Sequence, residues 1–371
     1  MGPRGTLAVS AASLAAVSPV LVVGALTCLM PAVTRPTLQF GIRVPRERAG
    51  APVIGRERRT YYWRTAAIGL CCTLVAVTVH SYWPSWLTRI ILLPELAADL
   101  GCFWVARRKI AAVKNADDWF AGLRQTVVTD TSWRTDPPRF PVRWLVPALA
   151  VMAATAAVGA LRYPGLPVYI VNGSGHRVSK SAVSALIVAG QLYFTTVYSG
   201  LMLIVHRSRP DIEAADPAAS TLRYRRFLAV FTRALLTLVA LIDTTLLLIA
   251  LPDWQVYRLS GIGRALPVLP FAAGVLLLGV VAARAGQGGS RLNGNVRGLA
   301  LARPAGTDRD DDQFWKAGLL YVHRDDPALV VSARFGVGWA LNFGNPVAWL
   351  LIAGTFAAWA GLAVLGAAAG M

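Results

Sequence analysis

Long apolar runs recur along this chain and constrain its fold more than any other feature. A helix that crosses a bilayer needs about 20 mainly apolar residues, and the 371-residue sequence, with a mean hydropathy of +0.51, offers eight such runs. Their approximate limits are 7–30, 65–82, 84–106, 143–162, 181–205, 227–251, 265–284 and 347–369. The first run is too long for the apolar core of a signal peptide, so we count it as a helix. The sequence predicts an all-α polytopic membrane protein with about eight transmembrane helices.

The basic residues indicate the orientation of these helices. Lys and Arg concentrate in segments 31–64, 107–143 and 206–226, whereas the connections near Pro84, 163–180 and 252–264 carry few. Because basic loops stay in the cytoplasm, this alternation predicts cytoplasmic large loops and both termini outside. The same rule explains the net charge of +18 without nucleic-acid binding. Arg and Ala dominate over Lys, as in GC-rich bacterial genomes, so we expect a bacterial cytoplasmic (inner) membrane.

Two segments allow other readings. Residues 65–106 either span twice or form a re-entrant hairpin, because Pro84 and Pro94 interrupt the runs. Residues 108–140 have apolar side chains at helical spacing and predict an amphipathic helix on the membrane surface. Those side chains are Ile110, Val113, Trp119, Phe120 and Leu123.

Composition also predicts the domain organisation. Residues 1–284 form a seven-helix transmembrane region, and residues 285–311, rich in Gly and polar residues, are a flexible linker. Residues 312–346 form a small cytoplasmic β-rich domain before the final helix at 347–371. Within it, DQFWKAG predicts a short helix, and LLYVH, ALVVSAR and WALNF predict three extended stretches.

Ionisable residues within apolar runs are costly and are candidates for function. Glu95 and Asp99 are one helical turn apart and share a face. Asp243 lies in the outer half of its run, where Arg89 is a possible partner, and Arg233 lies in the cytoplasmic half. These carboxyl groups either form a proton or cation path or join helices as buried polar contacts.

Enzyme chemistry has little support in the sequence. The four histidines are scattered, and HExxH, GxxxxGK[ST] and GxSxG patterns are missing. The four cysteines lie in apolar runs and are interpreted as packing residues. We therefore predict no catalytic residues, no metal site and no cofactor.

The region before the last apolar run resembles a short domain of unknown function found in bacterial membrane proteins. That domain has a Phe-Trp-Lys-x-Gly opening, then Asp-Asp-Pro, then Gly-x-Gly-Trp-x-x-Asn-Phe. The matching residues here, which are our candidates for a cytoplasmic docking motif, are Phe314, Trp315, Lys316, Gly318, Asp325, Asp326, Pro327, Gly336, Gly338, Trp339, Asn342 and Phe343. The loop with LQFGIRVPRERAG and RRTYYWR resembles the corresponding loop of the same proteins.

The external segment YPGLPVYIVNGSGHRVSKS resembles a segment shared with membrane immunity proteins for the sporulation-delaying toxin. The candidate residues are Pro167, Tyr169, Asn172, Gly175 and Lys180, and Tyr169 stands where the usual His would be. The resemblance implies a non-enzymatic sensor or immunity-type protein. Its expected partners are membrane lipids, an extracellular peptide and a cytoplasmic regulatory protein, without direct nucleic-acid binding. The alternative is a proton- or cation-coupled transporter that uses Glu95, Asp99 and Asp243.

Overall fold

The computed structural model describes residues 11–82, 90–126, 132–171, 177–258, 261–292 and 307–369. The chain forms two compact units. Unit 1 consists of Met1–Gln125, Thr307–Leu319 and Arg334–Val337, and unit 2 consists of Thr126–Gly306, Leu320–Ala333 and Gly338–Met371. The region predicted as one small domain, 312–346, therefore contributes segments to both units.

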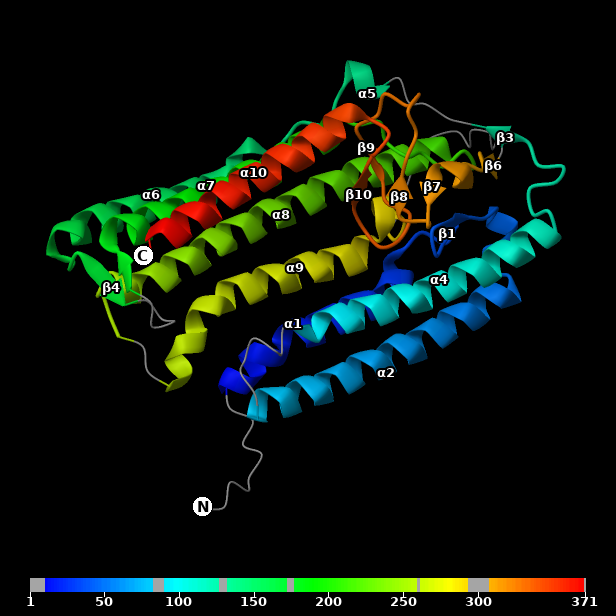
Figure 1. The fold of residues 1–371 in the computed structure, drawn as a ribbon. Coiled ribbons are helices and arrows are strands. Elements are labelled where there is room, and N and C mark those ends of the chain that lie inside the picture. The colour runs from blue at the N-terminus through cyan, green and yellow to red at the C-terminus, as the bar shows by residue number, and fades with distance from the viewer. Residues whose placement is uncertain are drawn as a thin grey trace. The chain divides into compact units, whose positions relative to one another are not determined.

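Unit 1 is built on three long helices, α1 (Ala11–Val33), α2 (Pro52–Tyr82) and α4 (Leu92–Ala116), which run alongside one another (Figure 1). Between α1 and α2 lie the short strands β1 (Leu38–Gln39) and β2 (Ile42–Arg43), which pair antiparallel, and the 3₁₀ helix η1 (Arg46–Arg48). The 3₁₀ helix η6 (Asp312–Phe314) and strand β7 (Trp315–Lys316) complete the unit. The short helix predicted in DQFWKAG is thus a single 3₁₀ turn.

An aromatic core forms at one end of the unit 1 helices. Phe335 packs against Phe40, Tyr61 and Phe103, with ring centroids 5.7, 6.2 and 4.7 Å away. Ring pairs of this kind add to the stability that buried area provides. Phe335 follows Phe40 by almost 300 residues, so this core joins the beginning of the chain to a segment near its end.

The predicted membrane-surface helix at 108–140 is wrong. Helix α4 continues to Ala116, and the chain then leaves the helix at Asp118, which has φ +40°. Trp119 and Phe120 turn inward and join Ile110 in the core. The helical spacing of these residues reflected their shared burial, and among the described residues from 117 to 140 only Ser132–Thr135 (α5) is helical.

Unit 2 contains five long helices: α6 (Val146–Arg162), α7 (Lys180–Arg207), α8 (Pro217–Asp253), α9 (Leu269–Ala285) and α10 (Pro346–Ala369). Two of these helices, α8 and α10, begin at a polar cap followed by Pro. Asp216 accepts from Ala219 N at 3.4 Å with Pro217 as the first residue of α8, and Asn345 accepts from Val347 N at 3.0 Å ahead of Pro346. Asn or Asp at the cap followed by Pro favours a helix start.

Short elements connect the unit 2 helices. The 3₁₀ helices are η2 (Val142–Leu145), η3 (Tyr163–Gly165), η4 (Gly261–Val268) and η5 (Gln287–Gly289). Strands β4 (Tyr169–Val171) and β5 (Arg177–Ser179) pair antiparallel, as do β9 (Val330–Ser332) and β10 (Trp339–Leu341). Strand β8 (Leu320–Tyr321) joins β10 through a parallel bridge from Tyr321 to Asn342. All three predicted extended stretches are present, but ALVVSAR pairs with WALNF. Strands β3 (Gln125–Thr126) and β6 (Thr307–Asp308) complete the set of strands in the described residues.

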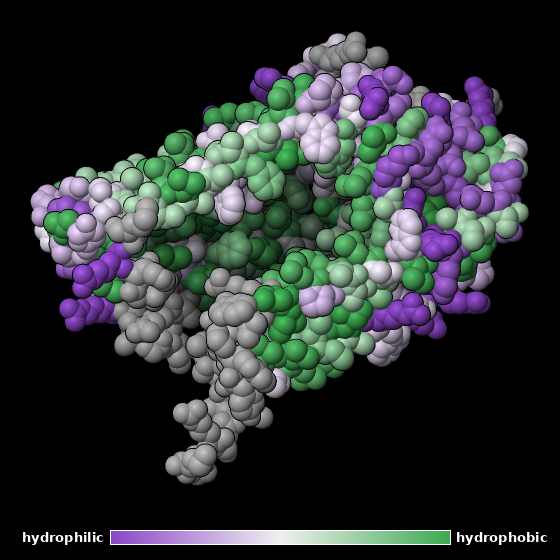
Figure 2. All heavy atoms as spheres, in the orientation of Figure 1, coloured by the Kyte–Doolittle hydropathy of each residue, from purple (hydrophilic) through white to green (hydrophobic). Residues whose placement is uncertain are grey.

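Eight long helices match the eight predicted runs, and six of them are long and apolar enough to cross a membrane within the described chain. These are Pro52–Val79, Val142–Gly165, Lys180–Arg207, Pro217–Asp253, Leu266–Gly289 and Pro346–Ala368. Figure 2 shows apolar side chains along the helices and hydrophilic ones gathered near helix ends. On α10, large apolar residues such as Leu350, 71% exposed, face outward, as lipid contact requires.

The other two predicted spans do not have the length and apolar composition of a membrane-crossing helix among the described residues. The shorter apolar stretch Pro19–Val33 belongs to α1, whose predicted start at residue 7 lies outside the described residues. Helix α4 combines carboxylates in its first half with basic residues such as Arg107 and Lys109 in its second half. Residues 83–89, on which the alternative of a re-entrant hairpin depends, lie outside the described residues.

Candidate functional site

Two carboxyl groups on α4 are buried against α1 and α2 in unit 1. Glu95 and Asp99 are 0% and 3% exposed, and both lie on the face that the sequence predicted. Thr27 donates to Asp99 Oδ2 at 2.7 Å, and the Tyr61 hydroxyl donates to the carbonyl of Thr27 at 3.1 Å. A short polar chain therefore links all three helices.

Glu95 has a different environment from Asp99. Both of its carboxyl oxygens are buried without a hydrogen-bond partner in the described part of the chain, and so is Asp99 Oδ1. A Cβ added to Gly24 of α1 would meet Glu95 Oε1 at 3.0 Å, and one added to Gly69 of α2 would meet it at 3.8 Å. The two glycines leave the space that this carboxyl group occupies. A buried ionised carboxylate without a partner is very costly, so this arrangement favours a bound proton or cation.

Asp243 of α8 lies in a separate polar cluster in unit 2. It is 0% exposed, and Thr195 of α7 donates to its Oδ2 at 3.0 Å. Gln191, also on α7, donates to the Asp243 carbonyl at 2.9 Å and to Thr155 of α6 at 2.8 Å. The cluster joins three helices of unit 2.

Arg89, which the sequence suggested as a partner of Asp243, lies outside the described residues. Arg233 is exposed on α8, away from the buried Asp243. The structure thus brings Glu95 and Asp99 together in one unit and Asp243 to polar neighbours in the other.

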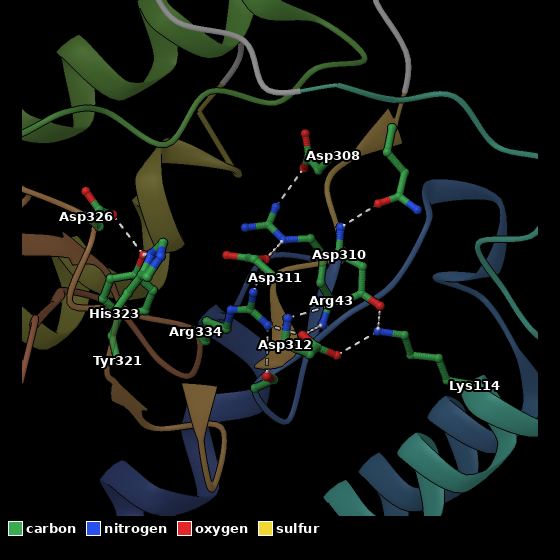
Figure 3. Close-up of polar contacts among 12 residues, drawn as sticks. Arg43, Lys114, Asp308, Asp310, Asp311, Asp312, Tyr321, His323, Asp326 and Arg334 are labelled. Carbon is green, nitrogen blue, oxygen red and sulfur yellow. Dashed lines mark hydrogen bonds and ion pairs between the residues drawn. The ribbon is translucent and has the colours of Figure 1, made fainter. Parts of the chain in front are cut away.

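The acidic segment before β7 is held to unit 1 by ion pairs, which sequence reasoning missed (Figure 3). Arg43 Nη1 is 2.9 Å from Asp308 Oδ2, and Arg43 Nε is 2.9 Å from Asp311 Oδ1. Arg334, 1% exposed on its side chain, pairs with both Asp311 and Asp312. It also donates to the carbonyl of Gly41 at 3.3 Å.

Lys114 of α4 completes this ion-pair cluster. Its Nζ lies 2.6 Å from Asp310 Oδ2 and 2.7 Å from Asp312 Oδ2. Burial by itself would raise the pKa of Asp311, but the positive charges of Arg43 and Arg334 hold it below its usual value. Burial opposes ionisation of Asp312 as well, and Arg334 and Lys114 hold its pKa low. Both carboxylates are therefore charged at neutral pH, and the cluster serves docking of the segment.

Many of the predicted docking residues are used inside the protein. Trp315 is 5% exposed and its ring lies 5.0 Å from the Arg334 guanidinium, while Gly318, with φ +75°, would place a Cβ against Arg107. In unit 2, Trp339 donates to the hydroxyl of Tyr224 at 3.0 Å and packs against Phe227 of α8. These contacts fasten the motif to its own helices.

Asn342 is the centre of the motif in unit 2. Its Nδ2 donates to the carbonyls of His323, Asp326 and Ala328 at 2.9, 3.0 and 3.1 Å. Its Oδ1 accepts from His323 N and Gly344 N, each at 3.0 Å. One fully buried side chain thereby fixes the turn between β8 and β9.

The Asp326 side chain stabilises the same turn. It accepts from the Tyr321 hydroxyl at 2.8 Å and from Ala328 N at 3.0 Å, and it pairs with Arg209 at 3.4 Å. Of the remaining motif residues, Phe314, Gly338 and Phe343 are half-buried and Gly336 is buried, whereas Lys316, Asp325 and Pro327 are exposed. In unit 2, a surface for a partner is therefore limited to Asp325, Pro327 and their neighbours, whereas Lys316 is the exposed motif residue of unit 1.

The start of the predicted linker is packed into unit 2. Gln287 is 1% exposed, donates to the carbonyls of Ala333 and Gly338 at 2.9 and 3.0 Å, and accepts from Gly338 N at 2.8 Å. Gly289, with φ +82°, lies against the backbone of Arg223. Residues 293–306, the centre of the predicted linker, are outside the described residues.

The external candidates lie around the β4–β5 hairpin. Pro167 and Tyr169 are exposed, and Lys180 donates to the carbonyls of Tyr163 and Leu166 at 3.3 Å each. Asn172 and Gly175 are outside the described residues. Lys180 is thus a structural contact that closes the base of the hairpin.

Comparison with protein families finds one match: residues 324–349 fit the model of a family of unknown function, DUF5808. No curated protein and no solved structure matches the chain. The matched residues include the Asn342 cluster and the cap of α10, so the family model covers the turn, β9, β10 and the start of the last helix. The helices and this match define a multi-pass membrane protein with a domain of unknown function near its C-terminus.

Proposed function

We propose that this protein is a proton- or cation-coupled membrane transporter that binds its coupling ion at Glu95 and Asp99. The observation that supports the proposal is the buried carboxyl group of Glu95, whose two oxygens have no hydrogen-bond partner among the described residues. A structural contact between helices would use those oxygens, as Asp99 does with Thr27. A group that must bind and release an ion instead needs acceptor oxygens that are free in one state.

The chemistry of the pair suits this role. Glu95 and Asp99 are four residues apart on one helix, so a proton or cation bound at one carboxyl group lowers the cost of ionising the other. Thr27 and Tyr61 connect the pair to α1 and α2. Binding of the ion would therefore alter the contacts among three helices, which is the requirement for coupling an ion to a conformational change.

Reconstitution in liposomes tests the proposal. The purified protein is placed in vesicles that contain the pH-sensitive dye pyranine, a pH step is applied, and the voltage is clamped with K⁺ and valinomycin. A parallel set receives a Na⁺ gradient. We expect faster dissipation of one gradient than in empty vesicles, and loss of that activity in Glu95→Gln and Asp99→Asn.

Glu47→Gln is the matched control, because Glu47 is exposed and lies in the short 3₁₀ helix η1, outside the long helices. It should behave as the unaltered protein does. Equal rates in protein-containing and empty vesicles under both gradients would refute the proposal. Full activity in Glu95→Gln would also refute it, because the amide can neither bind nor release a proton.

We propose as a second candidate a sensor or immunity-type protein that meets an extracellular peptide at the β4–β5 hairpin. The observation in its favour is the set of exposed apolar side chains there: Val168, Tyr169 and Val171 are 66%, 55% and 61% exposed. Cells that lack the gene are challenged with membrane-active cationic peptides and complemented with the unaltered protein or Tyr169→Ser. Equal sensitivity with and without the gene would reject this function.

A cytoplasmic regulator remains part of this second candidate. Its contact residues would be Asp325 and Pro327, the exposed motif members of unit 2, because Trp339 and Asn342 are occupied by internal contacts. Substitution of both residues by Ala should abolish regulator capture and leave protein abundance unchanged. Unchanged transcription of neighbouring genes in such a variant would argue against regulator docking.

A further inference from the structure

One face of α7 is polar along most of the helix, although the helix is a candidate membrane span. Ser184, Gln191, Thr195 and Ser199 are separated by seven, four and four residues, so they lie on one side of the helix. Gln191, Thr195 and Ser199 are 0%, 7% and 9% exposed. This face of α7 packs in unit 2 beside α8, which brings Asp243 to it.

The hydrogen bonds of this polar face are incomplete. Gln191 Nε2 and Thr195 Oγ1 have partners, as described above. Four buried oxygens have none within the described residues: Ser184 Oγ, Gln191 Oε1, Ser199 Oγ and Asp243 Oδ1. They belong to the same pair of helices, α7 and α8, and therefore call for a common explanation.

Protonation of Asp243 cannot account for all four oxygens. It adds one donor, which can serve one of the other three oxygens, and so leaves at least one serine hydroxyl without a partner. A buried polar group without a hydrogen bond costs about 1–3 kcal/mol, and this free-energy cost is larger within the apolar part of a bilayer. Ordered water supplies two to four hydrogen bonds per molecule and is the usual partner of such groups.

We propose that water molecules occupy this interface and that the polar face of α7 is an internal hydrated path leading past Asp243. With a rise of about 1.5 Å per residue, the path from Ser184 to Ser199 spans about 22 Å. Its ligands are water and the hydrated proton, because its lining groups are hydroxyl, amide and carboxyl oxygens. This path gives the otherwise buried Asp243 access to protons.

The path does not depend on the function proposed for Glu95 and Asp99. Those residues belong to unit 1, and the hydrated path lies entirely within unit 2. Its test uses solvent accessibility and does not use ion transport. Either proposal can therefore fail while the other stands.

Cysteine accessibility provides the experiment. The four native cysteines, Cys28, Cys71, Cys72 and Cys102, all lie in unit 1 and are replaced by Ala. Ser184→Cys and Ser199→Cys are then made one at a time, since sulfur for oxygen is nearly isosteric. Leu192→Cys is the control, because Leu192 is on α7 but 53% exposed on the side that suits lipid.

The small cationic reagent methanethiosulfonate-ethylammonium is applied to the protein in vesicles, and labelling rates are measured by mass spectrometry. The cysteine thiolate is the form that attacks this reagent, and it forms in water and not in lipid. We therefore expect Ser199→Cys to react at least about tenfold faster than Leu192→Cys. Elution and thermal unfolding of each variant are compared with the cysteine-free protein to establish that it is folded.

X-ray hydroxyl-radical footprinting supplies a second measurement without substitutions. Met202 is 5% exposed and lies three residues beyond Ser199 on the same face of α7. X-ray radiolysis of water bound beside it would produce hydroxyl radicals that oxidise its sulfur despite its burial. Labelling at either serine position above the control, or oxidation of Met202 in the folded protein, supports the path. Control-level labelling at both positions together with unoxidised Met202 overturns it.

Discussion

The Asn342 side chain offers the most direct test of how the C-terminal motif is held together. Replacing it by Ala removes two N–H donors, which three carbonyls share, and one oxygen that accepts from two backbone N–H groups, all at a fully buried position. Each such hydrogen bond contributes about 0.5–1.5 kcal/mol. Water that enters the vacated space restores part of the loss, so we expect Asn342→Ala to lower the local stability of the turn by about 3 kcal/mol.

Trypsin cleavage after Arg324 measures this local stability. Arg324 is exposed, but Asn342 holds the backbone on both sides of it through His323, Asp326 and Ala328. Cleavage requires release of that backbone, and its rate follows the open population when opening is fast relative to cleavage. Since about 1.4 kcal/mol corresponds to a factor of ten, we expect cleavage at Arg324 to accelerate about 100-fold.

Asn345→Ser is the matched control for this measurement. Asn345 lies three residues away, donates once to the carbonyl of Pro327 at 3.3 Å and caps α10, a role that Ser can retain. We expect less than about a threefold change in cleavage, which corresponds to well under 1 kcal/mol. A similar rate in Asn342→Ala and in the unaltered protein would refute the view that this side chain organises the turn.

Three further predictions concern buried contacts at other positions. The pKa values of Asp311 and Asp312 are lowered in the folded protein, so the two ionised carboxylates stabilise the fold fully above their unfolded pKa of about 4. This stabilisation is lost as the pH falls through the folded pKa values. Pepsin cleavage of residues 307–319 should therefore rise steeply only below about pH 4. Arg334→Met removes one of the two cationic partners of Asp311 and of Asp312, which keep Arg43 and Lys114, and should cost about 1–3 kcal/mol, whereas Arg334→Lys keeps the charge and should cost less, as thermal unfolding would show; equal loss in both would contradict the ion-pair explanation. Gly289→Ala should cost about 1–3 kcal/mol, because Gly289 has φ +82° and a Cβ would lie 2.5 Å from the carbonyl oxygen of Arg223; an unchanged unfolding temperature would contradict this.

The helices were the most predictable part of the fold. The predicted run 181–205 corresponds to Lys180–Arg207, because a bilayer-length apolar segment leaves little choice of structure. The prediction was wrong for 108–140. Trp119 and Phe120 continue the helical spacing that begins at Ile110, but the chain has already left the helix when it reaches them. Apolar spacing indicates burial, and two neighbouring aromatic residues can achieve burial from an irregular segment as well.

The candidate sites were also predictable only where they depend on residues that are close in sequence. The shared face of Glu95 and Asp99 followed from their spacing, which is a local property of a helix. The pairing of Arg43 and Lys114 with the acidic segment 308–312 could not be predicted, because it joins residues that are far apart in sequence. The run of Asp residues after a Gly-rich segment was the available signal, together with basic residues in two earlier loops, but charge alone does not select partners.

The ion-pair cluster also determines when unit 1 can be completed during synthesis. Its basic members Arg43 and Lys114 are made with the first three helices, whereas Asp308 follows Lys114 by about 190 residues. At about 5–20 residues per second, the ribosome needs roughly 10–40 s to supply the acidic partners. During that interval Arg43 and Lys114 lack the carboxylates that later neutralise them. Helices α1, α2 and α4 are synthesised early, but the unit they belong to is completed only after residues 307–337 have been made. A chain cut short before those residues would expose this unfinished unit to cellular quality control.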